Sequence, residues 1–169
     1  MIALYLSLLD TEQEQTLFEQ LYYGHRKLVK HIAFKITNND VLAEDAVQET
    51  MIKIARYIKR FEGLNFEQSA ALISVIAKTT AINFMVKEGR QSRVVATGEM
   101  FSVDKTDSED ELLGAIAALP TELREPLMLK YYYGFSGQET AVILHISHAA
   151  LRKRLQRAKE SLRDYLEER

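Results

Sequence analysis

Apolar residues recur at the spacing of an α-helix along most of this 169-residue chain, and that periodicity limits the folds open to it. Only two prolines and seven glycines occur, and long stretches contain neither. Strands joined by frequent tight turns would need more of both residue types. The pattern therefore favours an all-helical protein, and the length allows one ordinary domain or two small ones.

Three helices are expected in the first half of the chain, over residues 17–36, 41–60 and 68–87. Residues 37–40 separate the first two, because Thr-Asn-Asn-Asp is rich in side chains that cap helices and tolerate turns. Residues 63–65, Gly-Leu-Asn, separate the second helix from the third. The apolar positions expected in the core of this half are Leu17, Phe18, Leu21, Leu28, Val29, Ile32, Ile36, Val47, Met51, Ile54, Ile58, Phe61, Leu72, Ile76, Ile82 and Met85.

The helical periodicity disappears after Gly89, and polar residues dominate up to about residue 110. Such a composition is typical of a flexible linker. We therefore expect a first domain over residues 1–90, a linker over residues 91–110 and a second domain over residues 111–169. The side chains that could cap the first helix of the second domain are Asp107, Ser108 and Glu109.

Four shorter helices are expected in the second domain, over about residues 112–119, 121–133, 137–144 and 148–166. The residues expected to delimit them are Pro120 and Gly134 as terminators, and Ser136, with Glu139, and Ser147 as caps. Proline interrupts a helix because it lacks a backbone donor. A serine followed three residues later by glutamate has the spacing of a capping box.

The last two of these helices have the layout of a helix-turn-helix, with a short break at residues 145–147. The apolar residues that fall where two such helices pack are Ala141, Leu144, Ile146, Leu151 and Leu155. In this motif the second helix enters the major groove of DNA by its amino-terminal half. The candidate DNA contacts on that helix are His148, Arg152, Lys153, Arg154, Arg157 and Lys159.

Charge is segregated along the chain, although the formal net charge is only −2. Residues 152–159 hold five cations and no acid, whereas residues 104–111 hold five acids and one lysine. Screening limits each charge to about 10 Å at ordinary salt, so a local basic surface can bind phosphate in a mildly acidic protein. The basic run could instead be the solvated face of a terminal helix. DNA binding is favoured because this helix combines a cap, a short preceding turn, apolar residues at helical spacing and charges that are all positive.

An acidic face is expected on the second helix. Asp45 and Glu49 are four residues apart and Gln48 lies beside them, so the three share one side of the helix. Acids and an amide do not help to bind nucleic acid, but they suit a basic protein partner. Ile52, about one turn further on, belongs to the same candidate interface. The alternative is again a solvated helix face.

Two ordered sets of residues carry a resemblance to a known family. In the carboxy-terminal half they are Leu119-Pro120, Arg124-Glu125, residues 129–136 (Leu-Lys-Tyr-Tyr-Tyr-Gly-Phe-Ser), Glu139, Ala141, Leu144, Ile146-Ser147 and residues 151–159. In the amino-terminal half they are residues 43–51 (Ala-Glu-Asp-Ala-Val-Gln-Glu-Thr-Met), Phe61 with Gly63, and residues 76–84. They resemble the extracytoplasmic-function (ECF) branch of bacterial RNA polymerase sigma factors, over roughly residues 17–166 with the linker unmatched.

The resemblance implies a sigma factor that directs RNA polymerase to specific promoters for transcription initiation. By similarity, the first domain docks onto a coiled coil of the largest polymerase subunit through Asp45, Gln48, Glu49 and Ile52. The same domain, by similarity, reads the melted −10 element, for which the third helix offers Lys78, Asn83, Phe84 and Lys87. The second domain, by similarity, reads the −35 element as duplex and contacts the polymerase flap. An anti-sigma factor is a further partner that the resemblance makes possible.

The sequence departs from the family pattern at a few positions. Lys78-Thr79 stand where the family often has arginine-asparagine, Asn83 stands where it has aspartate, and no tryptophan occurs near Leu72. His145 occupies a turn position that usually takes glycine or asparagine, because a positive φ is often required there.

Other classes of protein fit the sequence less well. The main alternative is a helix-turn-helix regulator that binds duplex DNA without joining polymerase. An enzyme is not expected, because no nucleophile motif, glycine-rich phosphate loop or converging carboxylates appear. No cofactor or metal site is expected either: cysteine is absent, and His145 and His148 lack a third ligand nearby. The apolar amino terminus lacks the features of a signal peptide, and no run approaches the roughly 20 apolar residues that span a bilayer. We therefore expect a cytoplasmic protein without membrane insertion.

Overall fold

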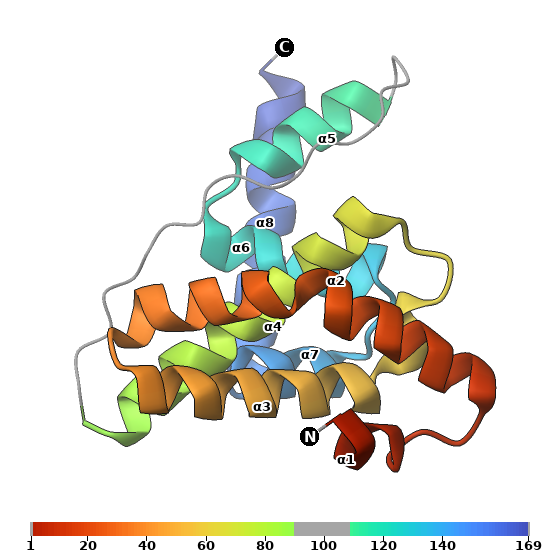
Figure 1. Ribbon diagram of the computed structural model, residues 1–169. Coiled ribbons are helices and arrows are strands. Elements are labelled where there is room, and N and C mark those ends of the chain that lie inside the picture. The colour runs from red at the N-terminus through yellow and green to blue at the C-terminus, as the bar shows by residue number, and fades with distance from the viewer. Residues whose placement is uncertain (1, 90–108, 169) are drawn as a thin grey trace. The chain divides into compact units, whose positions relative to one another are not determined.

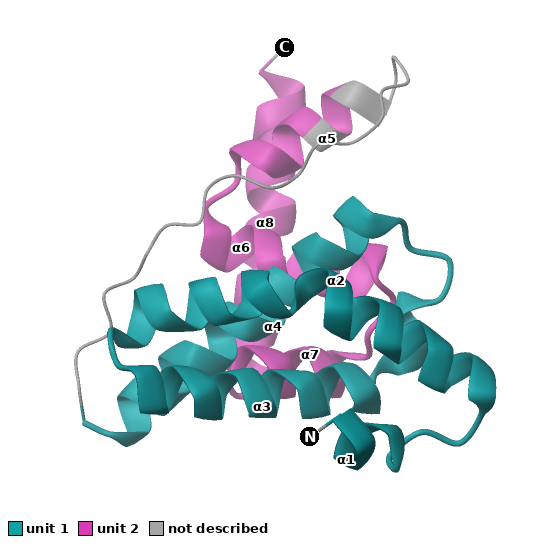
Figure 2. Ribbon diagram, viewed as in Figure 1, with its two compact units in different colours: residues 1–95 teal, residues 96–169 magenta. Residues whose placement is uncertain are grey.

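The computed structural model describes residues 2–89 and 109–168, and every regular element within those ranges is helical (Figure 1). The chain divides into two compact units, residues 1–95 and residues 96–169 (Figure 2). This confirms the prediction of an all-α protein built from two small helical domains. Most of the expected linker, residues 91–108, lies outside the described residues, as do the expected caps Asp107 and Ser108.

Unit 1 is built around three long helices that pack against one another in pairs. Its elements are α1 (Ile2–Leu6), α2 (Glu12–Thr37), α3 (Asp40–Arg56), the 3₁₀ turn η1 (Ile58–Phe61) and α4 (Phe66–Lys87). The second predicted helix, over residues 41–60, is thus divided into α3 and η1. The short helix α1 has no counterpart among the helices expected from the sequence.

Polar side chains fix where the three long helices begin. The side chain of Thr11 accepts a hydrogen bond from the Glu14 backbone at 3.2 Å, and the Glu14 carboxylate accepts in return from the backbone of Thr11. Asn65 and Gln68 form the same reciprocal pair at the start of α4. Asn39 caps α3 through the backbone N–H of Leu42. Such caps satisfy backbone donors that the first turn of a helix leaves without partners.

The core of unit 1 consists of the side chains that the helical spacing places inward. Those that are fully buried include Phe18, Val29, Met51, Ile54, Phe61, Leu72, Ile73 and Ile76. Each large apolar side chain that is buried in this way contributes about 1.5–3 kcal/mol to folding. Leu17, Leu28 and Ile82 were expected in the core but are only half-buried, because they lie at its margin.

The amino-terminal residues are docked onto this core. Tyr5 is buried, and its ring lies 5.6 Å from the ring of Phe18 and 6.1 Å from that of Tyr22. Aromatic pairs at these separations stabilise a fold beyond the area they bury. The apolar start of the chain is therefore packed against α2.

Among the described helices, α4 is long and apolar enough to cross a membrane by length and composition alone, contrary to the expectation that no run approaches that length. Most of that stretch is buried within the protein. The same composition is typical of a helix at the centre of a folded core, and α4 packs against both α2 and α3.

Unit 2 consists of short helices packed on a long terminal one. Its elements are α5 (Glu109–Ala118), α6 (Thr121–Leu127), the π-helical turn η2 (Met128–Tyr132), α7 (Gly137–Leu144) and α8 (His148–Glu167). Helix α8 contacts α5, α6 and α7. The core residues of this unit include Leu119, Leu123, Leu127, Leu129, Phe135, Ile143, Leu151, Leu155 and Ala158.

The helix predicted over residues 121–133 does not continue as an α-helix to its end. The backbone N–H of Tyr133 donates to the carbonyl of Met128, five residues earlier, at 3.0 Å, which is the bond of a π-helix. Pro126 lies inside α6 and cannot donate a backbone hydrogen bond. Met128, two residues after Pro126, still donates to the carbonyl of Arg124, so the π-type bonding begins after that point.

Candidate functional site

Two capped helices form the helix-turn-helix of unit 2. Ser136 accepts a hydrogen bond from the backbone of Glu139 at 3.1 Å, and the Glu139 carboxylate accepts from the backbone of Ser136 at 2.8 Å. Ser147 accepts from the backbone of Ala150 at 3.1 Å. The capping box of α7 and the cap of α8 are therefore confirmed as predicted.

The turn between these helices depends on a left-handed residue. His145 has a φ of 54°, and the backbone N–H of Ile146 donates to the carbonyl of Ala141 at 3.0 Å. These features belong to a common way of ending a helix, which usually takes glycine or asparagine at the left-handed position. The positive φ expected from the sequence is thus present, although histidine occupies the position.

Helix α8 has one buried side and one cationic side. Leu151, Leu155 and Ala158 are buried against the rest of unit 2. The predicted DNA contacts His148, Arg152, Lys153, Arg157 and Lys159 are exposed, and Arg154 is half-buried. None of the four arginine and lysine residues from 152 to 157 forms an ion pair with a described acid. Their charge is therefore available to a ligand.

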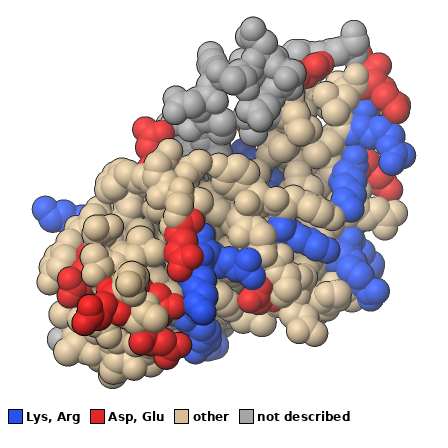
Figure 3. All heavy atoms as spheres, turned by 90° about the vertical axis from the view of Figure 1, so that its right-hand side faces the viewer, with Lys and Arg blue, Asp and Glu red and all other residues tan. Residues whose placement is uncertain are grey.

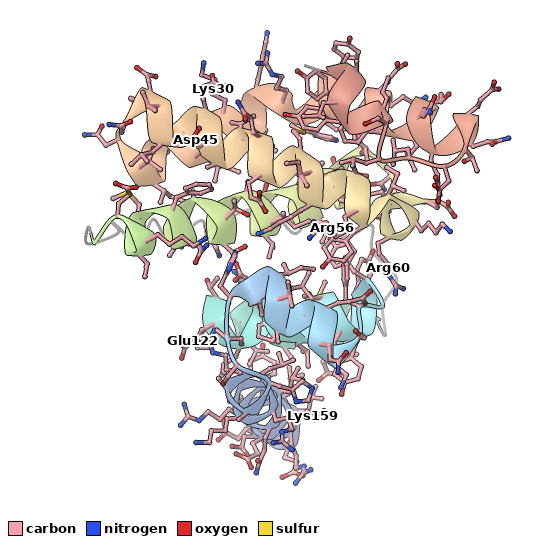
Figure 4. The ribbon with its side chains drawn as sticks, turned by 90° about the horizontal axis from the view of Figure 1, so that it is seen from below. Lys30, Asp45, Arg56, Arg60, Glu122 and Lys159 are labelled. Carbon is pink, nitrogen blue, oxygen red and sulfur yellow. The ribbon has the colours of Figure 1, made fainter. Side chains whose placement is uncertain are left out.

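Lys159 differs from the other cations of α8 because it contacts an aromatic side chain. Its Nζ atom lies 5.1 Å from the centre of the Tyr131 ring (Lys159 is labelled in Figure 4). A hydrogen bond from Lys159 is the main cause that lowers the pKa of the Tyr131 phenol. Two residues along a helix correspond to about 200°, so Lys159 and Arg157 point to different sides.

His148 lies over the start of α7. A Cβ atom built onto Gly137 would stand 3.0 Å from the Nε2 atom of His148. The absence of a side chain at Gly137 therefore leaves room for the imidazole at the amino-terminal end of α8, where a recognition helix approaches bases.

The predicted docking residues share one side of α3. Asp45 is exposed, and Gln48, Glu49 and Ile52 are half-buried. Figure 4 labels Asp45 and Arg56 on this helix. Val41, which the sequence did not single out, is 70% exposed and lies one turn before Asp45 on the same side. Val41 stands four residues before Asp45 in the sequence, and that spacing indicates the same side of the helix.

An ion pair joins this side of unit 1 to the neighbouring helix. The Nζ atom of Lys30 on α2 lies 2.7 Å from the Oε1 atom of Glu44 on α3. Both side chains are partly exposed, so the pair contributes little to stability.

On the face drawn in Figure 3, lysine and arginine side chains gather in patches rather than alternating evenly with the carboxylates.

The four residues predicted to read the −10 element do not lie together. Lys87 is exposed, and Asn83 and Phe84 are half-buried near the carboxyl end of α4. Lys78 is only 7% exposed. The helical rotation between Lys78 and Lys87 is about half a turn, so they lie on opposite sides of α4.

The described residues contain no group of three or more histidine, aspartate or glutamate side chains that could hold a metal ion. His145 and His148 therefore have no third ligand within this part of the chain. The features that the structure does assemble are surfaces for binding, on α3 and on α8.

Comparisons with known proteins match both units. Residues 21–91 match the family model described as Sigma-70 region 2, and residues 109–162 match the model described as Sigma-70, region 4. Together the two matches take in about three quarters of the chain.

Several curated proteins are similar over most of the chain. The ECF RNA polymerase sigma factor SigE of Mycolicibacterium smegmatis is 27% identical, over 88% of this chain and 61% of its own length. The RNA polymerase sigma factor CarQ of Myxococcus xanthus is 29% identical over 91% of each chain. The ECF RNA polymerase sigma factor SigL of Mycobacterium tuberculosis is 26% identical over 92% of each chain.

Two solved structures are also similar at low identity. The sigma factor RpoE from Bartonella quintana, in complex with the anti-sigma factor NepR, is 22% identical with a TM-score of 0.39, over 89% of this chain and 96% of that chain. CnrH, in complex with the cytosolic domain of CnrY, is 20% identical with a TM-score of 0.40, over 98% of this chain and 94% of that chain.

Proposed function

We propose that this chain, which belongs to the ECF branch of the sigma-70 family and directs RNA polymerase to promoters, divides that work between its two helical units. Residues 1–90 would bind core polymerase and read the −10 element, and residues 111–169 would read the −35 element. Residues 91–110 would connect them. The division follows the order of the two matched family regions along the chain.

The side of α3 that carries Asp45, Gln48, Glu49 and Ile52 is proposed to bind core polymerase. Two carboxylates on one exposed side attract a basic partner, and partly exposed Ile52 adds apolar area that binding would bury. Val41, at the start of the same side, extends that apolar area.

The exposed side of α8 is proposed to read the −35 element in the major groove. His148 and Arg152 lie near the amino-terminal end, which in a helix-turn-helix reaches base edges. Arginine binds guanine edges and phosphates through paired donors, whereas lysine acts as a point charge. Lys153, Arg154 and Arg157 would then contact the backbone, and Lys159 would do so from its position beside Tyr131.

The carboxyl end of α4 is proposed to contact the −10 element through Asn83, Phe84 and Lys87. A half-buried ring beside a cation and an amide suits unstacked bases and their phosphates. Lys78 is part of the same proposal in a different role: because it is buried, it would act by supporting α4 rather than by reaching DNA in this conformation.

The chain is proposed to act in the cytoplasm, where it would lend specificity to polymerase and catalyse nothing itself. An anti-sigma protein is proposed as a further partner of the chain. The observation that carries the proposal is the pair of oppositely charged surfaces on separate units. Asp45 and Glu49 lie on α3, and Arg152, Lys153, Arg154 and Arg157, which form no ion pair with a described acid, lie on α8.

Run-off transcription with core polymerase and the full chain tests the proposal. We expect transcripts from a subset of promoter fragments, and co-purification of the chain with core. Glu49→Lys should abolish both activities, because it reverses a charge at the docking side, whereas Glu19→Lys on α2 provides the same charge change elsewhere. Tight binding to duplex DNA without any association with core would instead support a regulator that acts without polymerase.

A further inference from the structure

The outer side of α2, in unit 1, carries a cationic surface in addition to the one on α8, and the proposed contacts with polymerase and promoter elements leave it unused. Residues 20–39 contain four lysine or arginine side chains and no aspartate or glutamate. Tyr23, Lys27, His31 and Lys35 recur every four residues, and all four are exposed. Residues four apart lie on one side of a helix. We call these four residues, together with the neighbouring Phe34, the α2 face.

Two residues of the α2 face are aromatic and are exposed to solvent. Tyr23 is 72% exposed and Phe34 is 41% exposed. The ring of Tyr23 meets the ring of Tyr22 edge-on, with 5.3 Å between their centres and 88° between their planes. Tyr22 in turn packs against Tyr5 and Phe18. Tyr23 therefore contacts one neighbour that is itself packed, which favours one orientation of its ring, and a ring that is already oriented loses less freedom on binding.

The cations along this side differ in how far their charge is committed. Lys30 pairs with Glu44 at 2.7 Å, and the guanidinium of Arg26 lies 5.6 Å from the centre of the Tyr22 ring. Lys27 and Lys35 form no ion pair or hydrogen bond with any described residue. These two lysines are the ones most available to neutralise an anionic ligand.

We propose that the α2 face binds single-stranded DNA released when the promoter opens. Lys27 and Lys35 would neutralise phosphates, and bases would stack on Tyr23 and Phe34. Cations interleaved with aromatic rings are the means by which proteins bind single strands without reading their sequence. The inference rests on the proposed function, since the single strand arises only in a complex with polymerase.

The spacing of the two rings favours a nucleic-acid strand over other anionic ligands. Tyr23 and Phe34 are eleven residues apart, which is about 16 Å along an α-helix. A strand offers a flat base at every nucleotide, so one segment can reach both rings and the lysines between and beside them. An acidic protein or an anionic lipid surface could use the same cations, and the experiment separates these ligands.

The test uses holoenzyme assembled from core polymerase and the full chain. Its affinity for a promoter fragment with a pre-melted bubble is measured over a series of salt concentrations. The variant Lys27→Ala/Lys35→Ala should lower the slope of log K against log salt by about 1.4, because each phosphate contact on a single strand contributes about 0.7. The matched control Lys27→Arg/Lys35→Arg retains both charges and should keep the wild-type slope.

The aromatic part is tested in the same assay. Tyr23→Ala and Phe34→Ala should each weaken binding to the bubble fragment about fivefold or more, because each removes one stacked base. Tyr23→Phe keeps the ring and should bind as the wild type does. All variants should bind core polymerase alone with unchanged affinity.

The outcomes distinguish this inference from the proposed function. Wild-type chain that fails to bring core polymerase to the bubble fragment would contradict the proposed function. Wild-type binding that the alanine variants match in affinity and slope would overturn the inference alone. Weaker binding of the variants to core without DNA would assign the α2 face to a protein partner. Wild-type binding to anionic phospholipid vesicles that the variants lose, with bubble binding intact, would assign it to a membrane surface; either result overturns the inference.

Discussion

The Nζ atom of Lys53 donates a hydrogen bond to the Oγ1 atom of Thr80 across 3.0 Å, between α3 and α4. Both residues are buried. Burial lowers the pKa of Lys53, and the nearby carboxylate of Glu49 acts in the opposite direction. The ammonium group thus links the interior of unit 1 to a residue of the proposed polymerase-binding side.

Replacing Lys53 separates the effect of its charge from that of its packing. Lys53→Ala should lower the free energy of unfolding by about 1–3 kcal/mol, because it leaves Thr80 without this donor and removes a buried chain. Lys53→Met keeps most of the volume and removes a charge that is costly to bury, so it should destabilise less. Urea denaturation followed by circular dichroism measures both. A larger loss for the methionine variant would show that the charge itself stabilises unit 1.

The stability of unit 1 should depend on pH through His25. This residue is 2% exposed, and its ring lies 4.4 Å from that of Phe66. Burial lowers its pKa below the ordinary 6.5, so the unfolded chain binds the proton more tightly than the folded one. The contribution of His25 to stability is therefore present above pH 6.5 and is lost as the pH falls through the folded-state pKa.

His25→Phe removes the titrating group and keeps an aromatic ring beside Phe66. We expect its free energy of unfolding to fall less than that of the wild type between pH 6.5 and 5. His31→Gln, at an exposed position of the same helix, should retain the wild-type profile. Denaturant titrations over this range provide the measurement, and parallel profiles for wild type and His25→Phe would contradict the prediction.

Arg157 should contribute to promoter binding through phosphate. Arg157→Ala should lower the slope of log K against log salt for duplex −35 DNA by about 0.9, the contribution of one contact. Arg163 is also exposed but lies further towards the carboxyl end of α8, so Arg163→Ala serves as the control. Equal slopes for Arg157→Ala and wild type would remove Arg157 from the interface.

The turn of the helix-turn-helix stores backbone strain at His145. Residues other than glycine cost about 1–2 kcal/mol in the left-handed conformation, although glycine loses more freedom on folding. His145→Gly should therefore raise the free energy of unfolding by at most about 1 kcal/mol. Gly134, with a φ of 75°, allows the reverse test, and Gly134→Ala should be destabilising. Thermal melts of both variants measure the changes. A lower melting temperature for His145→Gly, or a higher one for Gly134→Ala, would contradict the prediction.

Local chemistry made much of unit 2 predictable. Ser136, Glu139 and Ser147 occupy the first turns of α7 and α8 as their spacing indicated, because a cap depends only on residues three apart. The positive φ at His145 agrees with what the family resemblance indicated for that turn position. Leu151 and Leu155 are buried as their helical spacing required.

Features that depend on contacts between distant residues were less accessible. Nothing near Lys53 or Lys78 in sequence indicates that these cations are buried, since burial is decided by the approach of other helices. Helix α1 has only five residues, which is too short for periodicity to be recognised, and it is held through Tyr5. The division between η1 and α3 and the π-turn after Pro126 likewise arise from packing and backbone bonding rather than from an apolar pattern.

The π-turn at Met128–Tyr132 sets the direction in which the following side chains point. A π-turn holds one more residue than the same stretch of α-helix, and one residue corresponds to about 100° of rotation. Deleting Tyr131 would let the backbone close into a regular α-helix, because the wider turn accommodates one extra residue, and the residues on either side would keep their orientation. Lys159 would then lose its aromatic partner without itself being altered, so the extra residue of one irregular turn supplies a contact to a cation nearly thirty positions later in the chain.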